Sequence, residues 1–145
     1  MVIGIIGESC TGKSTLADGL KRALGAQVYT GKDYLRLAKS EADAQRLFRE
    51  KLKEAETGGH VVYVVSEMEH LNLLPEGALR ILVTADLDVI KERFARRMHG
   101  SLPTPVAAML EKKHGCFDGA AHDVHLVSGC FDLDEVCALM RSRAT

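Results

Sequence analysis

One stretch of nine residues, 7–15, constrains this chain more than any other part of the sequence. It reads Gly-Glu-Ser-Cys-Thr-Gly-Lys-Ser-Thr and fits the pattern G-x-x-x-x-G-K-[S/T] at every fixed position. An apolar run over residues 2–6 comes directly before it, and leucines recur at every fourth position after it. A strand, a glycine-containing loop and a helix, in this order, form a phosphate-binding loop. The sequence therefore predicts a nucleotide site, and the alternative is a glycine-rich turn that binds no ligand.

Each position of this loop has an expected task. Gly7 and Gly12 let the backbone bend and approach closely, so that successive N–H groups and the N-terminus of the helix face the phosphates. Lys13 is expected to reach the β- and γ-phosphates, and the Ser14 hydroxyl to bind Mg²⁺. The predicted cofactors are ATP and Mg²⁺, with GTP left open as the donor. The predicted nucleotide-binding residues are Gly7, Ser9, Cys10, Thr11, Gly12, Lys13, Ser14 and Thr15.

The composition narrows the classes of protein that this loop can serve. A chain of 145 residues is long enough for one domain with a real core. The formal net charge of −1 gives no reason to expect nucleic acid or an anionic membrane as a partner. The 4 cysteines form no C-x-x-C pair, and no signal peptide is recognised in the sequence. Together these two features predict a reduced, cytoplasmic setting. The apolar run at the N-terminus is too short to span a bilayer.

Five apolar runs separated by helical patterns predict the fold. These runs cover residues 2–6, 26–29, 60–65, 79–83 and 124–127. The run at 60–65 is continuous rather than alternating, as in a parallel strand that is covered on both faces. Strands that alternate with helices form a parallel sheet with helices on both faces, so we expect a three-layer, doubly wound α/β domain. Ligands bind to such sheets at the carboxyl ends of the strands, where the loop at 7–15 lies.

Local patterns also predict where helices begin. The expected N-caps are Ser40, Asp86, Thr104 (with Pro105 as the first helical residue) and Asp132 (with Glu135 as its capping-box partner). His122 and His125 lie around the last predicted strand. We expect their imidazoles to point to opposite faces, which argues against a metal site formed by this pair.

Two further segments, together with the loop, resemble those of one enzyme family. Residues 33–36, Asp-Tyr-Leu-Arg, follow the second predicted strand, and residues 92–98, Glu-Arg-Phe-Ala-Arg-Arg-Met, follow the fourth. In this order of parts the chain resembles the P-loop small-molecule kinases, specifically nucleoside monophosphate kinases such as adenylate and cytidylate kinases. The resemblance implies a P-loop NTPase fold with the strand order 2-3-1-4-5. It further implies a single domain over 1–145, with an acceptor-binding helical segment at 32–57 and a short lid at 98–118.

The resemblance also assigns tasks to arginines. In the family, the arginine that matches Arg36 holds the phosphate of the acceptor nucleotide, and arginines that match Arg93 and Arg97 open a mobile lid. Arg93 and Arg97 are four positions apart, so both leave one helix face, and guanidinium groups suit phosphate oxygens well. The alternative for Arg93 and Arg97 is that they form a solvated basic face of the helix, or that Arg96 takes their role. The alternative for Arg36 is an ordinary surface position.

Several charged residues keep two interpretations each. Asp33 either binds an acceptor hydroxyl and takes its proton, as an aspartate does in shikimate-type kinases, or it orients and caps the chain. Glu67, at the end of the third strand, is either a second acid for Mg²⁺ or a loop charge. Lys112 and Lys113 lie where the family has further lid arginines. As lysines they could screen the charge of a phosphate but could not bind it bidentately. The family's Asp-Gly-Phe-Pro-Arg segment is absent near Glu67, which leaves the acceptor open.

Together these residues predict an ATP-dependent phosphotransferase that moves the γ-phosphoryl group to a nucleotide, a nucleoside or a related small-molecule acceptor. One alternative is a nucleotide-binding regulatory protein without efficient transfer, and another is a metabolite kinase of the shikimate or gluconate type. The expected catalytic residues are Lys13, Asp33, Arg93 and Arg97, the substrate-binding residues are Asp33 and Arg36, and the metal-binding residues are Ser14 and Glu67.

Overall fold

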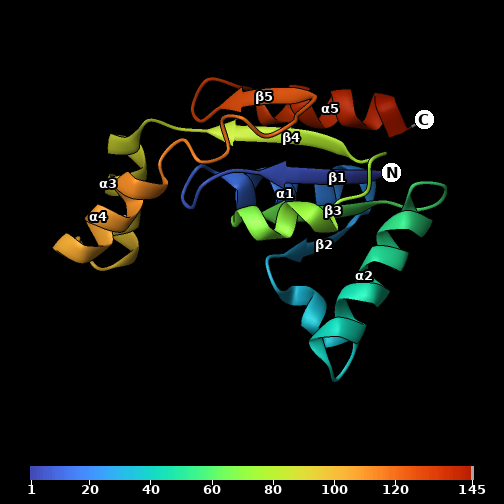
Figure 1. Ribbon diagram of the computed structural model, residues 1–145. Coiled ribbons are helices and arrows are strands. Elements are labelled where there is room, and N and C mark those ends of the chain that lie inside the picture. The colour runs from blue at the N-terminus through green and yellow to red at the C-terminus, as the bar shows by residue number, and fades with distance from the viewer. Residues whose placement is uncertain (145) are drawn as a thin grey trace.

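The computed structural model describes residues 1–144 and contains one parallel sheet of five strands in the order β2-β3-β1-β4-β5 (Figure 1). The strands are β1 (Val2–Ile6), β2 (Gln27–Thr30), β3 (Val61–Val65), β4 (Leu79–Thr84) and β5 (Val124–Val127). The helices are α1 (Lys13–Leu24), α2 (Glu41–Ala55), α3 (Leu87–Arg97), α4 (Thr104–Lys113) and α5 (Leu133–Ala144), with two short 3-10 helices, η1 (Asp33–Leu37) and η2 (Met68–Leu73). This architecture confirms the predicted doubly wound α/β fold and its strand order. The last residue of the predicted domain, 145, lies outside the described residues.

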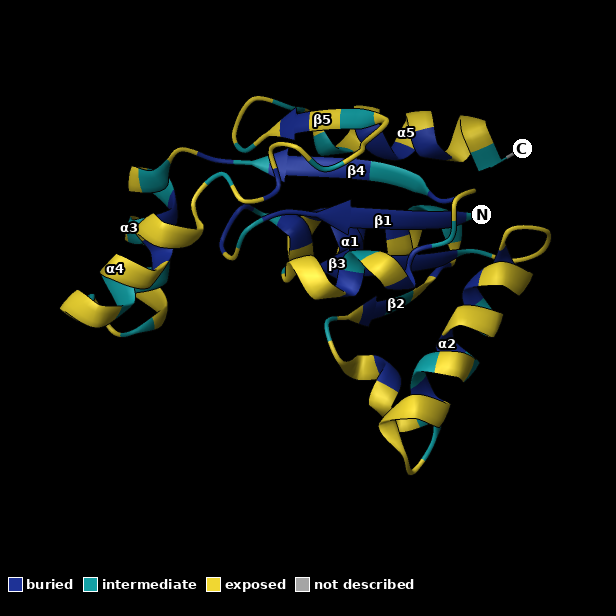
Figure 2. Cartoon of the chain, viewed as in Figure 1, coloured by how far each residue is buried: buried dark blue, intermediate teal, exposed yellow. Residues whose placement is uncertain are grey.

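Helices cover the two faces of the sheet with separate apolar cores. On one face α1 and α5 pack on each other and on the sheet, around Leu16, Leu20 and Met140. On the other face, side chains from α2, η1 and η2 pack against the sheet. Every residue of β1 and β3 is buried (Figure 2), which explains why both runs are continuously apolar instead of alternating.

A cluster of aromatic rings anchors α2. Phe48 of α2 is fully buried, and the centre of its ring lies 4.9 Å from Tyr29, 5.6 Å from Tyr34 and 4.8 Å from Tyr63. These tyrosines belong to β2, η1 and β3, so one side chain of α2 contacts three other elements. Beyond the cluster, α2 projects away from the sheet and exposes its outer face (Figures 1 and 2).

Most predicted helix starts are confirmed, and one is wrong by a residue. Ser40 and Asp132 accept hydrogen bonds from the first-turn N–H groups of α2 and α5. Asp86 occupies the N-cap of α3, although its side chain accepts no capping hydrogen bond. The N-cap of α4 is Pro103 instead of Thr104, because the Pro103 carbonyl already accepts hydrogen bonds from the first turn of this helix.

The two histidines near β5 do not point to opposite faces, so that prediction is wrong. The centres of the His122 and His125 rings lie 5.8 Å apart. His122 precedes β5, so the alternation of side chains along the strand does not apply to it, and its Nδ1 lies 2.8 Å from the Ala120 carbonyl oxygen. His125 Nε2 lies 2.8 Å from Thr84 Oγ1. Within residues 1–144, no group of three or more His, Cys, Asp or Glu side chains could hold a metal ion.

The helices α3 and α4 lie beyond the carboxyl end of β4, away from the rest of the sheet (Figure 1). They pack on each other through a small core that includes Ile90 and Leu110, and Cys10 of the 7–15 loop belongs to the same core. This packing brings the arginine-bearing helix α3 next to the loop. Among residues 1–144, none of the helices combines the length and the apolar character that crossing a bilayer requires.

Candidate active site

The loop at 7–15 leaves the carboxyl end of β1 and lies between the ends of its two neighbours. Gly7 donates its N–H to the Val65 carbonyl of β3 at 3.1 Å. A Cβ atom at Gly7 would lie 2.4 Å from the Val83 carbonyl oxygen of β4, so no larger residue fits there. Cys10 and Gly12 have positive φ angles of 66° and 96°, which turn the loop into α1. The first turn of α1 has no side-chain cap, so its N–H groups are free to bind an anion.

Lys13 lies within the loop and is only 5% exposed. Its Nζ donates a hydrogen bond to the Glu8 carbonyl. Burial lowers the pKa of Lys13 to about 8; the Arg97 charge acts in the same direction, whereas Cys10 and Glu8 act to raise it. An anion beside Nζ would favour the charged form of the amine and so offset the cost of burial. Lys13 is therefore placed to bind a negative group.

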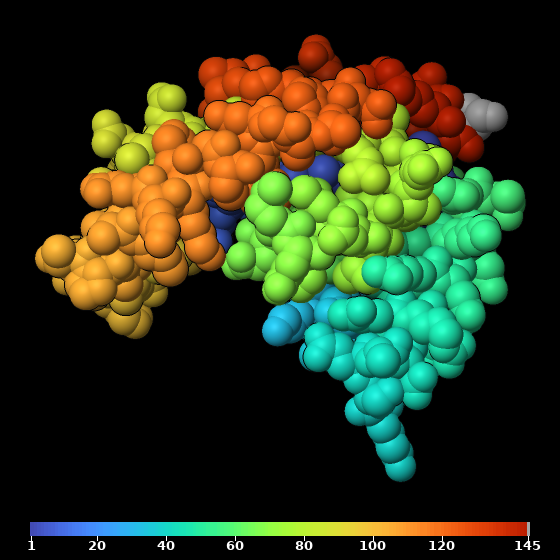
Figure 3. All heavy atoms as spheres, in the orientation of Figure 1, coloured from blue at the N-terminus to red at the C-terminus, as the bar shows by residue number. Residues whose placement is uncertain are grey.

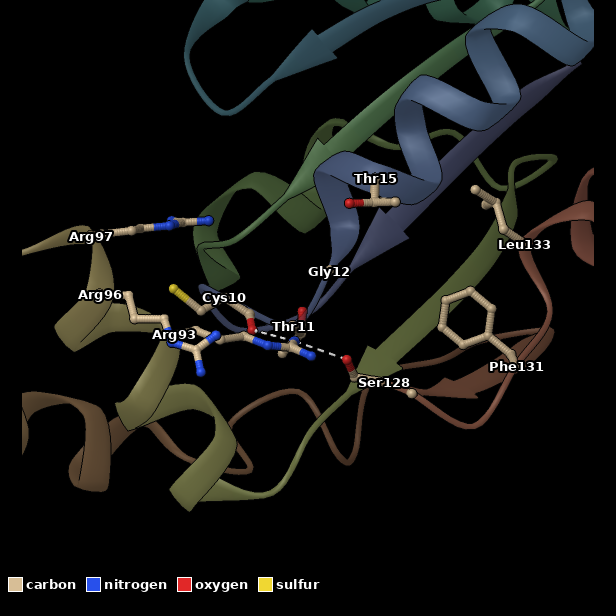
Figure 4. A pocket seen from close by; sticks show the side chains of 11 residues that line it. Cys10, Thr11, Gly12, Thr15, Arg93, Arg96, Arg97, Ser128, Phe131 and Leu133 are labelled. Carbon is tan, nitrogen blue, oxygen red and sulfur yellow. Dashed lines mark hydrogen bonds between the residues drawn. The ribbon is translucent and has the colours of Figure 1, made fainter.

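A cavity of about 480 Å³ opens beside the loop (Figure 4). Arginines of α3 line one side, and Phe131 and Leu133 line the opposite side. Positive groups beside the phosphate loop and apolar side chains across from them match the two ends of a nucleotide. The lining residues are Cys10, Thr11, Gly12, Thr15, Arg93, Arg96, Arg97, Ser128, Gly129, Phe131 and Leu133.

The three arginines of α3 that line this cavity differ in their freedom. Arg93 Nη1 donates to the Cys10 carbonyl at 3.0 Å and to Ser128 Oγ at 2.9 Å, so it links the loop to the end of β5 (Figure 4). Arg96 pairs with Glu92 at 2.5 Å on the exposed side of the helix. Arg97 makes no hydrogen bond or ion pair with residues 1–144, and its charge acts on Lys13. Arg97 is therefore the guanidinium most available to a phosphate.

The remaining side chains of the loop point to different surroundings. Thr11 is fully buried, and its Oγ1 donates to the Glu8 carbonyl at 2.9 Å, which closes the loop on itself. Ser9, Ser14 and Thr15 are exposed. Ser14, at the start of α1, offers a hydroxyl oxygen of the kind that Mg²⁺ takes as a ligand.

Glu8, at a variable position of the motif, ties the loop to the segment after α4. Glu8 Oε1 lies 3.1 Å from His114 Nδ1, and Oε2 accepts the N–H of Gly115 at 3.1 Å. The partners lie 106 and 107 residues away along the chain, so no spacing in the sequence could have indicated these contacts.

A second contact joins α4 to the strand beside the loop. Lys113 Nζ lies 3.5 Å from both carboxylate oxygens of Glu67, which follows β3. Glu67 thus faces a lysine of the predicted lid segment, and no contact within residues 1–144 joins it to Ser14. Its predicted role as a Mg²⁺ ligand stays a prediction.

Asp33 and Arg36 lie at the end of β2 and do not line the cavity at the loop. Asp33 Oδ2 accepts the N–H of Thr30 at 2.9 Å, as in a turn cap, and Arg36 Nε donates to the Asp33 carbonyl at 3.2 Å. The Arg36 guanidinium also lies 5.5 Å from the centre of the Tyr29 ring. The structure therefore does not bring Arg36 together with the arginines of α3, and the acceptor-binding roles of both residues stay predictions.

No family model matches this sequence, and no curated protein matches it. Solved structures do resemble the fold. An uncharacterized protein from Eubacterium ventriosum aligns with a TM-score of 0.68 and 16% identity, over 99% of this chain and 97% of the other. A shikimate kinase from Acinetobacter baumannii, in complex with shikimate, aligns with a TM-score of 0.64 and 12% identity, over 99% and 92%. A gluconokinase from Sinorhizobium meliloti aligns with a TM-score of 0.60 and 15% identity, over 99% and 92%. At these identities the likeness shows a shared fold, the P-loop fold that the sequence predicted.

Proposed function

We propose that this protein is an ATP- and Mg²⁺-dependent kinase of a small molecule. The observation that carries the proposal is the unpaired Arg97, which lines the cavity of about 480 Å³ beside the phosphate loop and acts electrostatically on the buried Lys13 of that loop. Phosphoryl transfer asks a protein mainly to position two substrates and to neutralise the charge of the moving group. The fold shared with proteins named shikimate kinase and gluconokinase supports this activity over other uses of a phosphate loop.

The donor nucleotide would lie along the cavity. Its phosphates would rest on the free N–H groups of α1, with Lys13 at the β- and γ-phosphates and Ser14 on the Mg²⁺ ion. The base would pack against Phe131, and Arg97 would neutralise the transferred group. Arg93 would act indirectly, because its hydrogen bonds hold the Cys10 carbonyl and Ser128 in place.

In the reaction, an acceptor oxygen would form a bond to the γ-phosphorus of ATP while the bond to the β,γ-bridging oxygen breaks and ADP leaves. The acceptor hydroxyl would lose its proton to Asp33, the first carboxylate after β2 along the chain. An acceptor with a hydroxyl group, as in metabolite kinases of the shikimate or gluconate type, is favoured over a nucleotide by the named neighbours and by the position of Arg36 over Tyr29.

One observation favours a second candidate, a nucleotide-binding regulatory protein without efficient transfer. The Glu67 carboxylate faces Lys113, so the acid expected to support Mg²⁺ already has a cationic partner. In this case ATP would bind to the loop, but no acceptor would be phosphorylated.

The two candidates are separated by measuring ADP formation from Mg·ATP with a panel of sugars, sugar acids, nucleosides and nucleoside monophosphates. The kinase predicts turnover with one class of acceptor, and Lys13→Ala should lower its rate about a hundred- to a thousandfold. Calorimetry with ATP runs in parallel. Binding of ATP without turnover on any acceptor would overturn the kinase and leave the regulatory protein.

A further inference from the structure

A second cavity, of about 280 Å³, lies on the α2 side of the sheet. It is formed between η1, α2 and η2 and shares no lining residue with the cavity beside the phosphate loop. Its walls carry both positive and negative side chains together with amides. The lining residues are Lys32, Tyr34, Glu41, Gln45, Arg49, Glu69, His70, Asn72 and Leu73.

His70 is the unusual member of this set, because it is a polar residue that is only 5% exposed and lacks hydrogen bonds from its ring. Nδ1 is buried without a partner, and Nε2 lies 3.6 Å from Glu69 Oε1, beyond hydrogen-bond distance. The ring is held by an edge-on contact with Tyr34, with 6.3 Å between ring centres. Buried imidazole nitrogens normally have partners, and the unsatisfied one here belongs to a side chain that lines the cavity, which points to a missing polar ligand.

The α2 wall of the cavity is a polar stripe. Glu41, Gln45 and Arg49 are spaced four apart, so they share one helix face beside the buried Phe48. Gln45 donates to the Tyr34 hydroxyl at 3.4 Å, whereas Arg49 has no hydrogen bond or ion pair with residues 1–144. Lys32, which precedes η1 and also lines the cavity, likewise makes no such contact within the described chain. The cations of Lys32 and Arg49 and several hydrogen-bond acceptors around this cavity are therefore available to a ligand.

The cavity lies within reach of the phosphate loop. Strands β2, β3 and β1 are neighbours, and neighbouring strands lie about 4.8 Å apart, so the ends of β2 and β1 are about 10 Å apart. The hydroxyl of Tyr63 donates to the Gly31 carbonyl at 2.7 Å. Burial raises the pKa of Tyr63, and the negative charges of Tyr34, Asp33 and Glu69 add to this rise. Figure 3 shows the N-terminal segment at the bottom of a hollow between the α4 side and η2.

We infer that this cavity holds the acceptor of the proposed kinase, and that the acceptor is a small polyhydroxylated molecule, such as a sugar, a polyol or a sugar acid. The inference rests on the proposed function. Hydroxyl groups donate and accept hydrogen bonds, so they satisfy cations, carboxylates, amides and an imidazole alike. One hydroxyl would extend towards Lys13 and Asp33 to receive the phosphoryl group, and the others would stay between His70 and Arg49.

A nucleoside monophosphate fits this arrangement poorly. Its phosphate would have to lie beside the γ-phosphate, which would leave the base for the distal cavity. A base needs a planar apolar surface to stack on, but the apolar lining residues Tyr34 and Leu73 are only 1% and 4% exposed. The exposed lining is polar and charged, which suits hydroxyl groups.

The test compares Arg49→Gln with the matched variant Arg46→Gln, because both arginines are exposed on α2 and only Arg49 lines the cavity. The acceptor probes are D-glucose, sorbitol and gluconate on one side and cytidine and AMP on the other. With the preferred probe, Arg49→Gln should raise KM for the acceptor about tenfold or more, because a hydrogen bond from a charged group is lost, while KM for ATP stays within about twofold. Arg46→Gln should change neither, and His70→Phe, which keeps a ring against Tyr34, should weaken acceptor binding like Arg49→Gln.

Binding is measured separately by calorimetry with the same probes, so that this inference and the kinase activity can fail independently. If a polyhydroxylated probe binds, Arg49→Gln weakens this binding and no ADP forms, the proposed acceptor site is supported and the proposed kinase activity is contradicted. Phosphorylation of cytidine or AMP in preference to all three polyhydroxylated probes would keep the kinase and overturn the inference. Equal acceptor affinities for the Arg46 and Arg49 variants, or no binding of any polyhydroxylated probe, would also overturn it.

Discussion

The two halves of the site are built in different ways. The half around the phosphate loop takes Lys13, Ser14 and its backbone N–H groups from nine consecutive residues, and α3 together with the segment from the end of β5 to the start of α5 completes it from afar. The half around the second cavity has no continuous segment, because its walls come from η1, α2 and η2. A local motif can therefore be recognised in the sequence, whereas a pocket assembled from three separate elements becomes visible only in the folded chain.

The halves also differ in what holds them in place. The phosphate loop lies between β3 and β4: the Gly7 N–H bonds to the Val65 carbonyl of β3, and the Val83 carbonyl of β4 leaves no room for a side chain at Gly7. The elements that form the second cavity are packed together through the aromatic rings around Phe48, while the outer face of α2 is exposed (Figure 2). Loss of a few buried contacts should therefore loosen the second half and leave the loop intact, and the predictions below test this difference.

The largest expected effect comes from Phe48→Ala, which removes the ring that joins α2 to β2, β3 and η1. The cavity left behind should lower the free energy of unfolding by about 3–5 kcal/mol, as measured by urea denaturation. Affinity for ATP should change little at temperatures where the variant is folded, because the loop does not touch this cluster.

The control for this variant is Leu35→Ala, which truncates a side chain of η1 that is 40% exposed. Its effect on the free energy of unfolding should stay within about 0.5 kcal/mol. If Phe48→Ala weakened ATP binding as strongly as acceptor binding, the two halves would not be independent.

The next effect concerns the loop itself. Lys13→Ala should lower kcat about a hundred- to a thousandfold, because it removes a positive charge from the water-poor site where the transferred group develops charge. The fold should persist, since the change also removes a buried amine. Lys21→Ala, on the exposed side of the same helix, serves as the control and should behave like the wild type. Steady-state kinetics check the prediction, and equal rates for both variants would exclude Lys13 from the reaction.

The contrast between the halves explains how much could be predicted from the sequence. The apolar runs gave all five strands and the motif gave the loop, since both depend on residues that are neighbours in the chain. The pairing of Glu8 with His114, the burial of His70 and the position of Arg36 over Tyr29 could not be predicted, because each depends on residues brought together by tertiary packing. In a short 3-10 helix such as η2, the sequence shows no hydrophobic periodicity from which the burial of a polar residue could be predicted.

A third prediction uses the titration of Lys13, whose pKa falls from 10.5 to about 8 in the folded protein. Below pH 8 the folded and unfolded states both carry the proton. Between pH 8 and 10.5 the unfolded state binds more protons, so the free energy of unfolding should rise with pH, by up to about 3 kcal/mol in total. Urea denaturation of the nucleotide-free protein at several pH values measures this rise, and Lys13→Met should lack it.

The same titration should appear in nucleotide binding. Phosphates favour the charged amine, so ATP binding above pH 8 must take up a proton, and the affinity should fall by up to about tenfold for each further pH unit. Calorimetry in buffers of different ionisation enthalpy detects this uptake. An affinity that stays constant between pH 7 and pH 9.5 would show that Lys13 is fully charged before the nucleotide arrives.

The smallest effect concerns the link between the loop and the segment after α4. Glu8→Ala removes the contacts of the carboxylate with His114 and the Gly115 N–H, and should lower the free energy of unfolding by about 1 kcal/mol. The Gly115 amide should exchange with solvent faster, whereas the amides around Phe48 should keep their rates. Glu111→Ala is the control, because it breaks an ion pair with Lys91 between α3 and α4 without touching the loop. Unchanged exchange at Gly115 in the Glu8 variant would mean that packing alone holds this segment against the loop.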